Sequence, residues 1–119
     1  MDINVKLVKS ANNGDLRGVK YAMENGADIS YEDYFAFTHS AEAGHLDIVK
    51  YLVSIGQDVT VNDNYAIRWA ANDGRLEVVK YLVSQGADIS SRDNWALIYA
   101  RENGHLEIVK FIERTIKLS

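Results

Sequence analysis

The segment Gly104-His105-Leu106-Glu107-Ile108-Val109-Lys110 repeats a pattern that occurs earlier in the chain at a constant spacing of 30 residues. Its first glycine belongs to the series Gly14, Gly44, Gly74 and Gly104, and its Val-Lys pair recurs at residues 19, 49 and 79. Further series at this spacing are Gly26, Gly56 and Gly86, then Asp28, Asp58 and Asp88, and finally Asp33, Asp63 and Asp93. Chance does not keep so many positions in one register, so the chain is an internal repeat.

Each period is predicted to contain two short helices joined by a glycine turn. In the third period, Ala66-Ile67-Arg68-Trp69-Ala70-Ala71 precedes the turn, and apolar residues then recur at helical spacing at Leu76, Val79, Leu82 and Val83. Gly74 and Gly86 are predicted to end the two helices, because glycine adopts a positive φ at little cost. Asp63 is predicted to be the N-cap of the first helix. Helices of about 8 to 10 residues are marginal alone, so stacking must stabilise them, as in a solenoid.

Small residues predict that the first helices of adjacent repeats lie close together. Two equivalent positions hold Ala11, Ala41 and Ala71, and Ser10, Ser40, Ala70 and Ala100. The last repeat breaks these patterns with Arg101 and Glu113, and the first repeat carries Lys6 and Lys9 where later repeats are apolar or aromatic. Terminal repeats need such polar outer faces. We therefore expect a complete array in one domain, 1–119, with repeats at about 3–32, 33–62, 63–92 and 93–119, the first and last acting as caps.

Composition narrows the classes of function. The chain has 119 residues, 47% of them apolar, a net charge of -4, and neither cysteine nor proline. Its apolar runs are too short for a membrane span of about 20 residues, and the N-terminus lacks the apolar region of a secretory signal. Without cysteine there are no disulfides, thiolate metal sites or Cys nucleophiles, which fits an intracellular, cytoplasmic protein. The negative charge argues against nucleic acid as a partner.

The segment at residues 104–110 resembles the G-H-L-E-I-V-K stretch of ankyrin repeats, and Gly86-Ala87-Asp88-Ile89 resembles the G-A-D-V that follows their second helix. The resemblance covers all four repeats. It implies an all-α ankyrin-repeat solenoid of four helix-turn-helix units with a concave binding face and no catalysis. The chain is therefore expected not to be an enzyme, to need no cofactor, and to bind another protein as a monomer.

The chain departs from the usual ankyrin pattern of 33 residues with T-P-L-H at the start of the first helix. The aligned tetrapeptides are Phe35-Ala36-Phe37-Thr38, Tyr65-Ala66-Ile67-Arg68 and Trp95-Ala96-Leu97-Ile98. Three residues are missing between repeats, so the usual β-hairpin finger should shrink to a tight turn with the aspartate capping the helix. The stretch 63–71 resembles the short ankyrin repeats of giant DNA viruses of amoebae, which implies a host protein as the partner.

The histidines are candidates for catalytic or metal-binding residues. His45 and His105 occupy equivalent positions, and Arg75 fills the same position in the third repeat. A position that accepts arginine serves neither metal ligation nor proton transfer, so we expect a structural role and no metal or catalytic site. Acidic residues three before Lys50, Lys80 and Lys110 predict i,i+3 ion pairs of about 0.2–0.5 kcal/mol each on a solvated face.

Comparison between repeats separates packing positions from surface positions. Tyr21, Tyr51, Tyr81 and Phe111 are nearly constant and are predicted to pack between units, and Phe35, Tyr65 and Trp95 are predicted to be half structural. Other equivalent positions vary in chemistry, and large aromatics dominate interface energetics. The predicted partner-binding surface comprises Tyr34, His39, Glu42, Asn64, Trp69, Asn72, Asp73, Asn94 and Tyr99. Because the fingers are short, this surface should be a shallow groove.

Two alternatives stay open. The chain could be a structural subunit that self-associates through its aromatic face, which light scattering across concentration would reveal. It could also be a small-molecule binder or an enzyme, which would need a closed pocket above about 300 Å³ with converging polar groups.

Overall fold

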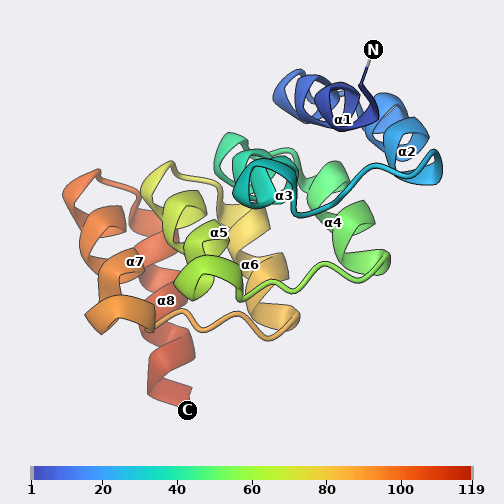
Figure 1. Cartoon of the computed structure of the whole chain (residues 1–119). Coiled ribbons are helices and arrows are strands. Elements are labelled where there is room, and N and C mark those ends of the chain that lie inside the picture. The colour runs from blue at the N-terminus through green and yellow to red at the C-terminus, as the bar shows by residue number, and fades with distance from the viewer. Residues whose placement is uncertain (1, 119) are drawn as a thin grey trace.

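The computed structural model describes residues 2–118, which form eight α-helices and no strand (Figure 1). The helices are α1 (Ile3–Asn12), α2 (Leu16–Glu24), α3 (Tyr31–Ala43), α4 (Leu46–Ser54), α5 (Val61–Asn72), α6 (Leu76–Ser84), α7 (Ser91–Glu102) and α8 (Leu106–Leu118). Odd-numbered helices form one layer and even-numbered helices the other, so each repeat contributes one helix to each layer. The predicted all-α solenoid is confirmed. None of the described helices is long and apolar enough to cross a membrane.

Glycines end the helices as predicted. Gly74 has φ 80°, and its N–H donates to the Ala71 carbonyl at 3.3 Å. The next N–H, of Arg75, donates to the Ala70 carbonyl at 2.8 Å. This pair of bonds is the Schellman motif, in which glycine supplies the left-handed residue that closes the helix. The motif turns the chain sharply, so α6 packs back against α5.

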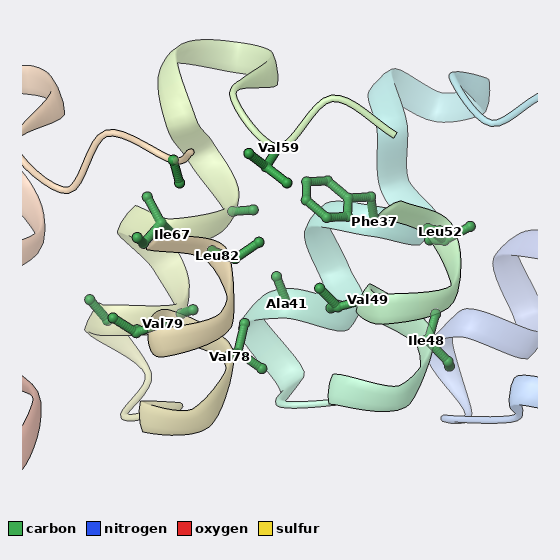
Figure 2. Packing of buried hydrophobic residues seen from close by; sticks show 14 of the residues in the cluster. Phe37, Ala41, Ile48, Val49, Leu52, Val59, Ile67, Val78, Val79 and Leu82 are labelled. Carbon is green, nitrogen blue, oxygen red and sulfur yellow. The ribbon is translucent and has the colours of Figure 1, made fainter. Parts of the chain in front are cut away.

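The core runs between the two layers along the whole stack, which measures 46 × 23 × 19 Å. Figure 2 shows Phe37 and Ala41 of α3 facing Val49 of α4, with Ile67 of α5 in the neighbouring unit. The alanines predicted to lie between first helices, such as Ala41, are fully buried. The odd-numbered helices accordingly contact one another more extensively than the even-numbered helices do.

The opening turn of α3, of α5 and of α7 differs from the prediction. Three successive residues in each turn have a left-handed backbone with φ between 54° and 64°: Glu32, Asp33, Tyr34, Asn62, Asp63, Asn64, Arg92, Asp93 and Asn94. The prediction that Asp63 is an N-cap is therefore wrong, since the N-cap of α5 is Thr60, whose side chain does not bond to the free N–H groups of the helix. Left-handed residues with a side chain cost about 1–2 kcal/mol each, and Asn and Asp tolerate them best.

The aspartates instead link neighbouring turns. Asp63 forms an ion pair with Arg92 of the next turn at 3.0 Å. Asp33 accepts a hydrogen bond from the Asn62 side chain at 3.3 Å. The Ser91 hydroxyl also donates to the Asp63 carbonyl at 2.9 Å. The turns therefore form a ladder along one edge of the stack, and the recurring aspartate is one of its connecting groups.

Two of the three predicted helical ion pairs form. Lys80 lies 3.9 Å from Glu77, and Lys110 lies 3.5 Å from Glu107. The third pair, between Lys50 and Asp47, is not among the ion pairs of residues 2–118. The Lys50 ammonium lies instead 5.6 Å from the ring centre of Tyr81. Lysine and tyrosine of adjacent repeats thus make cation–π contacts on the second-helix side.

The two residues that break the pattern in the last repeat contact each other. Arg101 of α7 and Glu113 of α8 form an ion pair at 3.6 Å, and both side chains are more than half exposed. Charged residues at these positions keep this face of the fourth repeat polar.

Candidate partner-binding surface

Four aromatic side chains of α5 and α7 form a continuous line. The ring centres of Tyr65 and Trp69 lie 5.8 Å apart, those of Trp69 and Trp95 5.0 Å, and those of Trp95 and Tyr99 4.2 Å. Residues four apart share one face of a helix, and the contact between tryptophans joins the two repeats. We refer to Tyr65, Trp69, Trp95 and Tyr99 as the aromatic row.

The aromatic row is partly open to solvent. Trp69 is half-buried, and Tyr99 at the end of the row is 37% exposed. Trp69 and Tyr99 were predicted to be surface residues, and the structure brings them together through Trp95. Tyr65 and Trp95 were predicted to be half structural and were left out of the predicted surface, yet they belong to the same row. Their i,i+4 spacing from Trp69 and Tyr99 was the signal that could have placed them there.

A surface groove of about 560 Å³ lies beside the aromatic row. We call it the aromatic groove, and its lining residues are Asp33, Asn62, Asp63, Tyr65, Arg68, Trp69, Arg92 and Trp95. It runs across the left-handed turns and the first helices of adjacent repeats. Aromatic walls with charged groups at the edges are typical of an interface that buries rings and keeps a polar rim.

Arg68 fixes one wall of the aromatic groove. Its side chain is 5% exposed and donates to the carbonyls of Asp63 at 3.0 Å and Asn62 at 3.3 Å. Its guanidinium also lies 5.2 Å from the ring centre of Trp95 and 5.8 Å from that of Tyr65. Burial lowers the pKa of Arg68. The repeat pattern does not predict this role, because the equivalent residues Thr38 and Ile98 are not arginine.

A second groove of about 290 Å³ lies between the second and third repeats. We call it the acidic groove, and its lining residues are Glu32, Asp33, Phe35, Thr38, Glu42, Asn62 and Tyr65. It shares Asp33, Asn62 and Tyr65 with the aromatic groove. The two grooves are therefore continuous along the first-helix side of the stack.

Burial affects the titration of two predicted surface residues near the acidic groove. The pKa of the half-buried Glu42 is raised, first by desolvation and then by the negative charge of Asp73. The His39 ring stacks on Phe35 with centres 4.9 Å apart. Burial, with a smaller contribution from His45, lowers the pKa of His39. Glu42 lines the acidic groove, whereas His39 stacks on its lining residue Phe35 without lining the groove itself.

Asn64 lies at the same face but is committed to an internal bond. It is 9% exposed, and its side-chain oxygen accepts from the Asp88 N–H at 2.8 Å. Asn94, the equivalent residue in the next repeat, is exposed and makes no such bond. Tyr34 is half-buried in its left-handed turn, and its carbonyl accepts from the Thr38 hydroxyl at 3.1 Å.

Asn72 and Asp73 lie at the opposite end of the first helix and link repeats. The Asn72 side chain donates to Asp73 at 2.8 Å and accepts from Asn103 at 3.0 Å. The Asn72 carbonyl accepts from His105 Nε2 at 2.9 Å. Arg75 donates in the same way to the carbonyl of Glu42 at 2.9 Å, so this position has the structural role predicted for it.

No group of three or more acidic, histidine or cysteine residues within 2–118 is placed to hold a metal ion. A family profile described as "Ankyrin repeats (3 copies)" matches residues 7–63 and 55–117. A search of curated proteins found no match.

Proposed function

This chain belongs to the ankyrin repeat family, and we propose that it binds a partner protein through the aromatic row and the two grooves beside it. Ankyrin repeats are generally modules for protein–protein interaction and form a non-enzymatic scaffold. The aromatic row is the observation that supports this surface. Large rings combine apolar area with few rotatable bonds, and they dominate the binding energy of protein interfaces.

The test compares two exposed aromatics on opposite sides of the stack. Tyr99→Ala removes the open end of the aromatic row, whereas Tyr21→Ala removes a ring that is 56% exposed on α2. We expect Tyr99→Ala to weaken capture of partners from a lysate of the source or its host by about 30-fold, as for a central hot spot of about 2 kcal/mol. Tyr21→Ala should leave capture unchanged. Equal capture by both variants would exclude the proposed surface.

Trp69→Ala is expected to affect stability as well as binding. Trp69 contacts both Tyr65 and Trp95, so its removal opens the middle of the row. The loss of binding should again be about 30-fold, accompanied by a lower melting temperature. Tyr99→Ala is the cleaner probe because Tyr99 contacts the row only at its end.

Self-association is the second candidate function. Apolar side chains stay exposed in the last repeat, with Ile98 at 43%, Tyr99 at 37% and Leu106 at 63%. We favour a monomer. Light scattering should then give the same molar mass at every protein concentration. The aromatic groove, at about 560 Å³, has the volume of a small-molecule site, but it is an open surface groove rather than a closed pocket.

The sequence also indicates what kind of partner the chain binds and where. The resemblance of residues 63–71 to the short repeats of giant DNA viruses favours a host protein as the partner, met in the host cytoplasm. The net charge of -4 and the acidic groove favour a protein over nucleic acid or an anionic membrane.

A further inference from the structure

The acidic groove combines negative charge with aromatic surface. Three of its lining residues are acids, namely Glu32, Asp33 and Glu42, and two are the aromatics Phe35 and Tyr65. Neither lysine nor arginine lines it. Carboxylates complement a cation by charge, and aromatic faces attract a cation through the ring quadrupole. The two features belong to the same groove, and both are complementary to the same class of ligand.

The acids of this groove are not neutralised from within the protein. None of the ion pairs among residues 2–118 includes Glu32, Asp33 or Glu42. Asp33 accepts only a neutral amide bond, from Asn62. Arg92 pairs with Asp63, and Arg68 donates to backbone carbonyls while its guanidinium lies 5.8 Å from the ring centre of Tyr65. Arg75 bonds the carbonyl of Glu42 and not its carboxylate. The three carboxylates of the groove are thus left to a cation of another molecule.

The size and spacing of the groove restrict that cation. The three acids do not form a group that could hold a metal ion, as judged over the described part of the chain. A volume of about 290 Å³ lies at the lower end of small-molecule sites. It suits one long side chain that inserts from a partner. A planar guanidinium can bond two carboxylate oxygens at once and stack on an aromatic ring, which a lysine ammonium does less well.

We propose that the acidic groove receives an arginine side chain of the partner protein. This inference rests on the proposed function, because the aromatic row next to the groove supplies the rest of the interface. Tyr65 belongs to both, so the arginine lies directly beside the residues that contact the aromatic row. The partner therefore carries an arginine next to an apolar or aromatic contact.

The state of Glu42 in the free protein is consistent with this occupant. Desolvation and the charge of Asp73 raise the pKa of Glu42, so its carboxylate lacks compensating positive charge. A guanidinium beside it would favour the ionised form. Burial at an interface then strengthens the attraction, because fewer waters screen it.

The test uses nuclear magnetic resonance titration of the whole chain with Nα-acetyl-arginine methylamide. We expect saturable shifts of the backbone amides of Phe35, Glu42 and Tyr65, and none with the neutral citrulline analogue. Glu42→Gln should weaken this binding by about tenfold, the usual effect of losing one charge-assisted bond. Glu24→Gln, at an exposed acid on α2, should leave it unchanged. Added salt should weaken it further, since salt screens exposed charges.

Several results would overturn the assignment. These are an absence of saturable shifts at the three amides, equal binding of the citrulline analogue, equal binding of the matching lysine analogue, or the same shifts with magnesium chloride. The titration requires no partner protein, so it is independent of the capture experiment with Tyr99→Ala. If the arginine compound binds but Tyr99→Ala still captures partners as the unsubstituted chain does, only the proposed function is refuted. If Tyr99→Ala loses capture as expected but the arginine compound does not bind, only this inference is refuted.

Discussion

At the scale of single residues, the left-handed turns show how a side chain offsets a costly backbone conformation. Asn64 has φ 60°, where a residue with a Cβ is strained. Asparagine tolerates this conformation better than most residues, and its side-chain oxygen accepts from the Asp88 N–H. Asn4 accepts from the Asp28 N–H at 2.7 Å in the first repeat. One residue type thus serves both the turn and the loop that follows the second helix.

Asn64→Ala is expected to destabilise the protein more than Asn94→Ala. Both residues have a positive φ, 60° and 64°, so the backbone cost of alanine is common to the two variants. Only Asn64 satisfies the Asp88 N–H. Loss of this bond should lower the free energy of unfolding by about 0.5–1.5 kcal/mol more. Urea unfolding followed by circular dichroism measures the difference, and equal losses would show that the bond is unimportant.

The pH dependence of two carboxyl variants should have opposite signs. The folded-state pKa of Glu42 is raised from 4.5, so its stabilising contribution exists below 4.5 and is lost as pH rises through the raised value. Glu42→Gln should therefore raise the melting temperature at neutral pH, with no gain below pH 4.5.

Asp58 provides the matched control. Backbone and side-chain bonds from Thr60 lower its pKa from 3.8, so its contribution is present above 3.8 and is lost as pH falls through the lowered value. Asp58→Asn should lower the melting temperature at neutral pH, and the loss should shrink in acid. Melting curves from acid to neutral pH that show the same sign for both variants would contradict these assignments.

At the scale of helices, the end of each first helix is joined to the next repeat. The His105 ring reaches back to the Asn72 carbonyl and lies against Gly74. Arg75 reaches Glu42 and lies against Gly44 in the same way. The glycine is therefore required twice, once for its positive φ and once because the side chain from the next repeat occupies the space of a Cβ.

Gly74→Ala should destabilise the protein more than Gly104→Ala. Both glycines have a positive φ, 80° and 75°, so alanine costs about 1–2 kcal/mol in each. A Cβ at Gly74 would lie 2.7 Å from the His105 ring, whereas a Cβ at Gly104 meets nothing within 4 Å. Displacing the ring breaks its bond to Asn72, which adds about 1 kcal/mol. Thermal unfolding of the two variants side by side tests this, and identical melting temperatures would rule out the inter-repeat contribution.

The helix pairs and their glycine ends were predictable because these signals are local and recur at one spacing. The left-handed turns were not, since Asp and Asn are favoured both as N-caps and in left-handed backbone. What distinguishes the two is the pairing of Asp63 with Arg92, 29 residues later, and the burial of Arg68. In the site, the pattern found Trp69 and Tyr99 but could not show that Asn64 is buried.

At the scale of the molecule, stabilising contacts run mainly between adjacent repeats. Besides the contact of α1 with α2 inside the first repeat, the most extensive contacts join α1 to α3, α3 to α5, and α5 to α7, and the stack is 46 Å long and 19 Å at its narrowest. Such a solenoid is close to a one-dimensional system, in which each unit is stabilised by its neighbours. A unit flanked on both sides therefore has more support than one at an end.

Hydrogen exchange should reveal this gradient. Amides of α5 and α6, which have a repeat on each side, should exchange more slowly than those of α1, α7 and α8. The reason is that an end repeat can open while the rest of the stack stays folded. Mass spectrometry of exchange under native conditions measures the order. Uniform protection along residues 2–118 would instead indicate a single cooperative unit.

The two ends of the chain lie at opposite ends of the stack (Figure 1), and this determines how the protein responds to tension. A force applied between the termini acts along the row of repeats, and each unit is retained only by the contacts to its neighbours. Repeats should detach one after another, each releasing roughly 100 Å of extended chain from its 30 residues. Under tension the chain is therefore expected to lengthen in steps, one repeat at a time, and not to unfold in a single event.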